Sequence, residues 1–156
     1  MNIKSTKLIV LSIITLLVSV TACKDDNSVS LESISKLDSL TTVNLLASTS
    51  SSKKWSTQSF TFAGENDTCR LDDEITIYPN GTYTYDGGAI LCGGPDSLKT
   101  KTGTWSFNFD DQRVVFTPDI ATNPETTVEI VSLNDSIVTL KSSYLLIPIT
   151  GTYKVK

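Results

Sequence analysis

The stretch at residues 74–87 constrains the fold of this chain more than any other. Apolar and aromatic side chains alternate with polar ones on both sides of Asn80-Gly81. The alternating residues are Ile75, Ile77, Tyr83 and Tyr85. A period of two on either side of Asn-Gly predicts a β-hairpin, because both residues accept the positive φ of a type I′ turn. We therefore expect a two-residue type I′ turn between antiparallel strands.

The same alternation recurs along the chain and predicts eight strands. Their expected ranges are residues 55–62, 73–78, 82–86, 101–109, 113–117, 126–133, 136–143 and 149–155. Short turns join most of them, so neighbouring strands should be antiparallel. We expect an all-β domain in which an eight-stranded up-and-down meander closes into a barrel, because closure removes exposed strand edges. A β-sandwich is the alternative.

The interior of the expected barrel is rich in aromatic residues. An eight-stranded barrel has room inside for side chains or for one small ligand. The candidate ligand-lining residues are Trp55, Tyr83, Tyr85, Trp105, Phe107 and Tyr153. Other residues expected to face inward are Ile75, Ile77, Phe109, Val114, Phe116 and Val155. The alternative to a ligand cavity is a filled aromatic core.

Residues 1–22 predict a secretory signal peptide. Lys4 and Lys7 form a basic start, and residues 8–20 are apolar and uncharged. That run is shorter than the roughly 20 residues of a membrane-spanning helix, so it suits the apolar region of a cleaved signal. The segment is therefore excluded from the reasoning about the fold.

The motif Val20-Thr21-Ala22-Cys23 resembles a bacterial lipobox. The resemblance implies that Cys23 becomes the lipidated N-terminus of the mature protein, carrying acyl chains such as palmitate. More than one acyl chain is needed for a stable anchor, and the resemblance implies chains on both the sulfur and the amine. The alternative is a secreted protein in which Cys23 is unmodified.

The next three residues, Lys24, Asp25 and Asp26, resemble the lipoprotein export signal of Bacteroidota. That resemblance implies an outer-membrane lipoprotein exposed on the cell surface; a periplasm-facing lipoprotein is the alternative. Without residues 1–22 the chain has 11 basic and 17 acidic residues, a net charge of −6. Such a balance argues against nucleic-acid binding and against a polybasic membrane contact.

The residues after Cys23 are rich in serine and threonine and predict a flexible tether over residues 23–44. Apolar residues at every third position allow a short amphipathic helix within it. These residues are Leu31, Ile34, Leu37 and Leu40, with Ser30 as the N-cap. We expect the packed domain to occupy residues 45–156.

Cys69 and Cys92 are the two cysteines that remain once Cys23 is lipidated. Export would place them in an oxidising compartment, where a disulfide is expected. The bond would join the segment before the second strand to the loop after the third. A reactive or metal-binding thiol pair is the alternative, but the chain has no histidine and no further cysteine to support it.

A family resemblance covers residues 45–156. A tryptophan starts the first strand, a Cys-x-x-Asp-Asp segment precedes an Asn-Gly hairpin, and Gly-Thr-Trp opens a later strand. The matching positions are Trp55, Cys69, Asp72-Asp73, Asn80-Gly81 and Gly103-Thr104-Trp105. This pattern resembles the lipocalin-like domain lipoproteins of Bacteroidota, and it implies a lipocalin-like barrel. Lipocalins proper have glycine where this chain has Lys53, so the resemblance is to the divergent lipocalin-like group.

The residues of common catalytic sites are scarce in this sequence. With no histidine, the chain lacks the commonest general base and metal ligand, and we expect no metal and no cofactor. Carboxylates do cluster, at Glu65, Asp67, Asp72, Asp73 and Glu74. They favour a solvated loop; a glycosidase pair or a Ca²⁺ site is the alternative.

Three Asp-Ser-apolar motifs match the O-glycosylation acceptor of the same bacterial phylum. Their serines are Ser39, Ser97 and Ser136. The alternative is that these three motifs occur by chance, because Asp-Ser is a common pair of residues in turns.

Two non-catalytic functions and one enzymatic function remain open. The leading interpretation is a surface lipoprotein whose barrel binds a small or apolar ligand, such as a lipid or a glycan. The second is a filled barrel that acts as an interaction or scaffold module beside an outer-membrane protein partner. A carboxylate-based glycosidase is a distant third.

Overall fold

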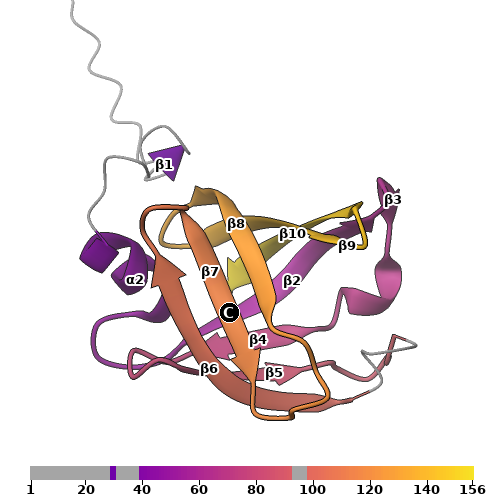
Figure 1. Ribbon diagram of the computed structural model, residues 1–156, viewed down its shortest axis with the longest axis horizontal. Helices are drawn as coiled ribbons and strands as arrows, with labels where there is room; N and C mark the ends of the chain where they lie inside the picture. The colour runs from indigo at the N-terminus through magenta and orange to yellow at the C-terminus, as the bar shows by residue number, and fades with distance from the viewer. Residues whose placement is uncertain (1–28, 31–38, 93–97) are drawn as a thin grey trace, which may run out of the picture.

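Eight antiparallel strands form a closed barrel (Figure 1). They are β2 (Lys53–Phe62), β4 (Glu74–Ile77), β5 (Thr82–Asp86), β6 (Thr100–Asn108), β7 (Arg113–Pro118), β8 (Thr126–Leu133), β9 (Ile137–Tyr144) and β10 (Ile147–Val155). Each barrel strand pairs with the next, and β10 pairs with β2 to close the ring. The predicted up-and-down barrel is confirmed, with every predicted strand present, and the β-sandwich alternative is wrong.

The computed structural model describes residues 29–30, 39–92 and 98–156. The predicted signal peptide at 1–22, Cys23 and the segment Lys24-Asp25-Asp26 lie outside the described residues. Most of the stretch in which a short helix was allowed, residues 31–40, lies outside them as well. Among the described residues, no helix is long and apolar enough to cross a bilayer.

Four short elements that the alternation pattern does not show accompany the barrel. Helix α2 (Ser39–Ala47) precedes β2, and the expected domain start at residue 45 falls inside it. Strand β1 (Val29–Ser30) pairs with β8, and β3 (Glu65–Asn66) pairs with β2. The 3-10 helix η1 (Thr68–Arg70) lies between β3 and β4.

The connections between strands lie alternately at two ends of the barrel, because the strands are antiparallel neighbours. One end, called the α2 end, carries helix α2, the β4–β5, β6–β7 and β8–β9 turns, and the end of β10. The other end, called the distal end, carries β3, η1, and the β5–β6, β7–β8 and β9–β10 connections. In Figure 1, α2 lies at the left and β3 at the right.

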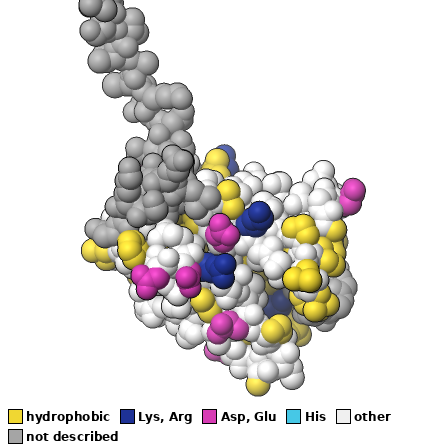
Figure 2. Space-filling model, turned by 45° about the horizontal axis from the view of Figure 1, so that its top comes forward, with side chains coloured by type: hydrophobic (Ala, Val, Ile, Leu, Met, Phe, Trp, Pro, Cys, Tyr) yellow, Lys and Arg dark blue, Asp and Glu magenta, His cyan; other side chains and the backbone are white. Residues whose placement is uncertain are grey.

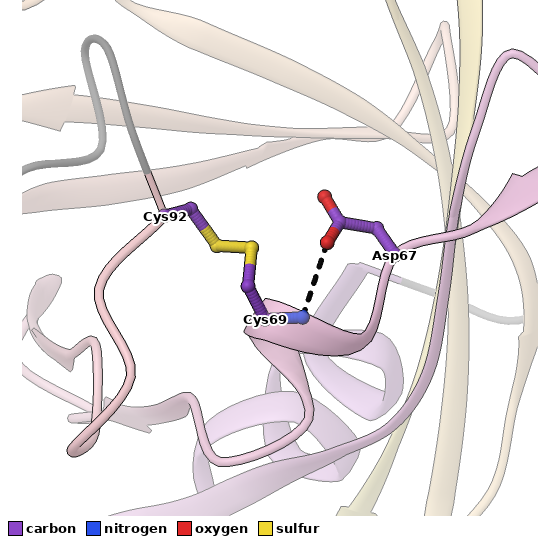
Figure 3. A group of neighbouring side chains, drawn as sticks. All are labelled: Asp67, Cys69 and Cys92. Atoms are coloured by element: carbon purple, nitrogen blue, oxygen red, sulfur yellow. Dashed lines mark hydrogen bonds between the residues drawn. A yellow bond between two sulfur atoms is a disulfide. The ribbon is translucent and has the colours of Figure 1, made fainter.

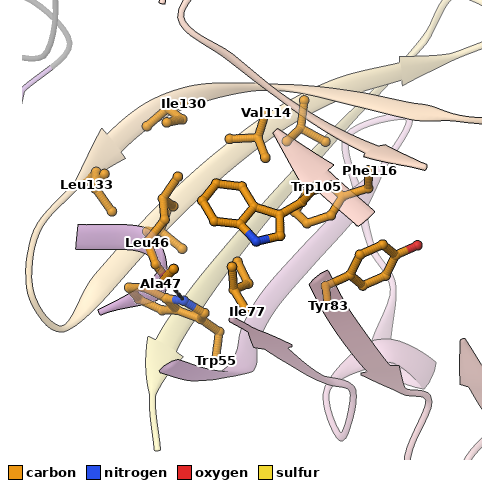
Figure 4. Packing of buried hydrophobic residues seen from close by; sticks show 12 residues of the cluster. Leu46, Ala47, Trp55, Ile77, Tyr83, Trp105, Val114, Phe116, Ile130 and Leu133 are labelled. Atoms are coloured by element: carbon orange, nitrogen blue, oxygen red, sulfur yellow. Dashed lines mark hydrogen bonds between the residues drawn. The ribbon is translucent and has the colours of Figure 1, made fainter. Parts of the chain in front are cut away.

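Helix α2 closes its end of the barrel. Leu46 and Ala47 are fully buried and join the core, and the indole N–H of Trp55 donates to the Leu46 carbonyl at 2.9 Å (Figure 4). The rest of the core comes from inward-facing residues of seven barrel strands. They are Trp55, Ile77, Tyr83, Trp105, Val114, Phe116, Val128, Ile130, Leu133 and Val138.

The turn after β4 differs from the expected type I′ turn. Gly81 has a φ of 82°, but Asn80 does not have a positive φ. The Gly81 N–H donates to the Tyr78 carbonyl, and the Tyr78 N–H donates to the Thr82 carbonyl, which makes a three-residue loop. Pro79 explains the difference, because its fixed φ suits the first corner of an ordinary turn and leaves only Gly81 left-handed.

Phe109 is also corrected by the structure. It was expected in the interior with Trp105 and Phe107, but its side chain is 42% exposed. Strand β6 ends at Asn108, whose side-chain oxygen accepts from the Asp110 N–H and starts the turn. The alternation therefore stops one residue before Phe109, and that ring lies outside the barrel.

Candidate functional site

The structure brings the predicted ligand-lining residues together, but it uses them as packing. Trp55, Tyr83 and Trp105 belong to the buried core (Figure 4), and Phe107, Tyr85 and Tyr153 pack against it. Both indole N–H groups donate to backbone carbonyls, that of Trp105 to Tyr78 at 2.9 Å. Figure 4 shows these rings interleaved with aliphatic side chains across the barrel. The aromatic interior therefore favours the filled core over a ligand cavity.

The described residues form at least two hollows on the outside of the barrel. The first, of about 350 Å³, lies beside α2 and is lined by Thr41, Asn44, Leu45, Ser48, Thr49, Lys53 and Asp135. The second, of about 290 Å³, is lined by Lys54, Glu74, Thr76, Thr84, Tyr85, Asp86 and Thr100. Most of the residues in both linings are polar or charged, and each lining includes a lysine and an acidic residue. Of the six predicted lining residues, only Tyr85 borders either hollow.

A polar cluster lies inside the distal half of the barrel. Asp73 is buried and accepts from the Tyr85 hydroxyl at 2.5 Å, and its carboxylate lies 3.7 Å from Arg70. Arg70 also stacks over the ring of Phe60, at 4.8 Å from the ring centre. Burial raises the pKa of Tyr153, near Arg70 and Asp73, to about 12, so its hydroxyl stays protonated at neutral pH.

The predicted disulfide is present at the distal end. Cys69 in η1 and Cys92 after β5 are bonded, with their Cα atoms 5.6 Å apart (Figure 3). Asp67 caps η1 by accepting from the Cys69 N–H at 3.1 Å. The three side chains are close enough to suggest a metal site, but both sulfurs are used by the disulfide. The group therefore acts as a covalent clamp between two loops.

Asp72 provides a second link between the same two loops. Its carboxylate accepts from the backbone N–H groups of Ala89 at 2.6 Å and Ile90 at 3.1 Å. These two hydrogen bonds lower the pKa of Asp72 below its ordinary value. Gly88 makes the approach feasible, because its φ is 65° and a Cβ there would lie 2.3 Å from the Asp72 carboxyl carbon. The two loops are thus held together by one covalent and two polar bonds.

The clamped loops carry exposed hydrophobic side chains. Leu71 follows η1, and Ile90 and Leu91 precede Cys92; all three are between 44% and 59% exposed. We call Leu71, Ile90 and Leu91 together the distal platform. Sequence reasoning missed it, although an Ile-Leu pair within a glycine-rich loop is a signal that could have been noticed.

Glu74, the last residue of the predicted acidic cluster, has two lysine partners. Glu74 pairs with Lys54 at 3.0 Å and with Lys156, on the outside of the barrel. Its pKa is lowered, first by the hydrogen bond from Lys156 and then by that from Lys54. A glycosidase general acid requires a raised pKa, so neither Glu74 nor Asp72 suits that role.

The predicted modification sites are only partly described. Ser39 at the start of α2 and Ser136 in the β8–β9 turn are both exposed, as acceptors of a glycan would need to be. Ser97 lies outside the described residues.

Comparisons with known proteins show a likeness in structure. No family model and no curated protein matches this chain. Among solved structures, the chain is similar to a lipocalin-like protein from Bacteroides uniformis, with 14% sequence identity and a TM-score of 0.46. The match covers 70% of this chain and 97% of the other. The barrel architecture of this chain is established by the pairing of its own strands, independently of this likeness.

Proposed function

We propose that this chain is a lipid-anchored interaction protein of a bacterial outer membrane, without catalytic activity. In this proposal the barrel is a filled scaffold and the distal platform is its recognition surface. One contrast carries the proposal: large aromatic residues fill the interior, whereas Leu71, Ile90 and Leu91 are held exposed by the disulfide and by Asp72.

The position of the N-terminal segment supports this orientation. Helix α2 enters the barrel at the end opposite the platform. Acyl chains on Cys23 would therefore attach the protein through the segment that precedes α2, and the two loops that carry the platform would remain accessible to a partner. The sequence resemblances at residues 20–26 favour the outer face of the outer membrane, with a periplasm-facing location as the alternative.

The platform suits a protein partner with an uncharged apolar patch. Leu71, Ile90 and Leu91 would be desolvated on binding, and the clamp reduces the conformational entropy lost there. Large exposed apolar residues grouped on rigid loops are typical of recognition surfaces.

A second candidate is binding of a small amphipathic ligand in the distal half of the barrel. The polar cluster of Arg70, Asp73 and Tyr85 favours it, because such a cluster could orient a polar head group beneath the clamped loops. This binding would require the loops to move aside.

Two measurements separate these candidates. The first is native mass spectrometry of the whole chain after incubation with lipid and glycan extracts. The second is crosslinking on cells with a photoreactive residue at Ile90, with one at Ile137 at the α2 end as the control. A discrete crosslinked protein from Ile90 alone, with no small-molecule adduct, supports the interaction protein. A stoichiometric small-molecule adduct supports the ligand-binding candidate instead.

A further inference from the structure

The turn between β9 and β10 exposes two leucines to an unusual degree. The side chain of Leu145 is 78% exposed and that of Leu146 is 95% exposed, the two highest values among the large hydrophobic residues that the structure describes. The turn belongs to the distal end but not to the platform. Its leucines therefore contribute almost nothing to the barrel core.

The backbone at these leucines is in a conformation that leucine rarely adopts. Tyr144 pairs with Ile147, so Leu145 and Leu146 are the two central residues of the turn, with φ of 48° and 70°. Positive φ at both positions is the requirement of a type I′ turn, which asparagine and glycine meet with little strain. Leu145 and Leu146 thus occupy two positions at which Asn-Gly would be more stable. This choice of residues indicates that the leucines have a role other than stabilising the fold.

Neighbouring residues extend the apolar character of this turn. Tyr144 and Phe62 are also exposed, and the Ala63 N–H donates to the Pro148 carbonyl at 3.0 Å, which holds the β2–β3 turn beside β10. We call Phe62, Tyr144, Leu145 and Leu146 the apolar tip. Residues 59–64 and 142–149, which contain it, include no charged side chain. Figure 2 shows hydrophobic side chains gathered at the edge of the molecule where these strands end.

We propose that the apolar tip inserts into the acyl region of a lipid bilayer. A protruding turn with two leucines at its apex and aromatic rings behind it can enter fluid lipid without a preformed cavity. No charge has to be desolvated within the tip. The acidic balance of the chain favours a zwitterionic surface over an anionic one.

A second copy of this chain suits the apolar tip less well than a bilayer does. The tip is convex, so a partner surface would have to offer an apolar hollow. The two hollows described above are lined mostly by polar and charged residues, with Lys53 and Asp135 in one and Lys54 and Glu74 in the other. Neither matches a pair of leucines.

The position of the tip is compatible with the proposed lipid anchor. Figure 1 shows β1 and the β9–β10 turn along the same, upper side of the barrel. Residues 23–28 precede β1 and can span about 20 Å at most. A lipidated Cys23 and the tip could thus contact one bilayer with the barrel lying along it. The orientation of the barrel along the bilayer depends on the proposed lipidation of Cys23. Insertion of the tip does not depend on it.

The test places a tryptophan reporter in the full chain mixed with phosphatidylcholine vesicles whose acyl chains carry bromine. Leu146→Trp reports on the tip. Ile137→Trp is the matched control, because Ile137 is also an exposed apolar residue and lies at the other end of β9. We expect bromolipid to quench the added emission of the Leu146→Trp chain and to leave that of the Ile137→Trp chain unchanged. The double substitution Leu145→Asn with Leu146→Gly should lower binding to the vesicles at least about tenfold.

Three results would overturn the proposal. The first is attachment to vesicles without quenching at position 146, which leaves the lipid anchor at Cys23 intact as a separate proposal. The second is equal quenching at positions 137 and 146. The third is absence of quenching together with a shift from dimer to monomer on the double substitution, which would show that the tip joins two copies.

Discussion

The indole N–H of Trp55 donates to the main-chain carbonyl of Leu46 at 2.9 Å, and both residues are fully buried. The carbonyls in the last turn of a helix have no partner within the helix. Trp55, in the first barrel strand, therefore satisfies a polar group that α2 would otherwise bury unpaired. The Trp55 side chain thus joins α2, which closes one end of the barrel, to β2, the first barrel strand.

Replacement of Trp55 by phenylalanine should destabilise the protein and loosen α2. The Leu46 carbonyl would remain buried without its donor, which lowers the free energy of unfolding by about 1–3 kcal/mol, in addition to the loss of packing. Urea denaturation would measure the change, and amide exchange would show its location in residues 39–47. Unchanged exchange in α2 would contradict this account of the hydrogen bond.

Gly103 should be intolerant of even a methyl group. A Cβ there would lie 2.2 Å from the Thr117 carbonyl oxygen and 2.8 Å from the Tyr83 ring. Gly103→Ala is therefore expected to lower the free energy of unfolding by about 1–3 kcal/mol or more. Gly87→Ala is the control, because a Cβ there would have no neighbour closer than 3.4 Å and Gly87 has no positive φ. Equal losses for both variants, measured by thermal unfolding, would show that steric overlap is not the cause.

The link between the two distal loops should weaken in acid. The pKa of Asp72 is lowered from its ordinary 3.8, so the carboxylate stabilises the loops above that value. This stability is lost as the pH falls below the ordinary pKa and through the lower folded value. Protection factors of the Ala89 and Ile90 amides, measured by NMR across this range, should decrease. In an Asp72→Ala chain they should already be low at neutral pH, and high values there would refute the link.

The Leu145→Asn, Leu146→Gly chain should be more stable than the native chain. Replacement of two left-handed leucines by residues that tolerate positive φ should add about 1–2 kcal/mol to the free energy of unfolding. The melting temperature should accordingly rise by several degrees. An Ile137→Asn chain, changed at an exposed site with ordinary backbone, serves as the control and should show no gain. A lower melting temperature for the double variant would mean that the turn is not strained.

Strand alternation predicted most of this fold. The period of two at residues such as Ile75, Ile77, Val114 and Phe116 reports directly on burial, so all eight barrel strands could be located from the sequence, whereas the two-residue strands β1 and β3 could not. Turn geometry was less predictable. Pro79 changes the conformation of an Asn-Gly turn, and the end of β6 at Asn108 places Phe109 outside the barrel.

The candidate site was harder to predict because its parts come from different loops. The disulfide could be inferred from the cysteine count, and it was found between Cys69 and Cys92. Leu71 and Ile90 lie on separate loops, which the Cys69–Cys92 disulfide and the hydrogen bonds of Asp72 hold together. Such tertiary hydrogen bonds leave no periodic signal in a sequence.

Pairing of the last strand with the first sets the order in which this barrel can form. Trp55 lies opposite Val155, about 100 residues later in the chain, and β10 pairs with β2 along most of its length. Neither β2 nor β9 has its second neighbour until residues 147–155 have been synthesised. Contacts between such distant residues slow folding, because a long loop must close before the pairing is gained. Two strand edges therefore stay open until residues 147–155 have emerged, and during that interval the nascent chain should depend on chaperones.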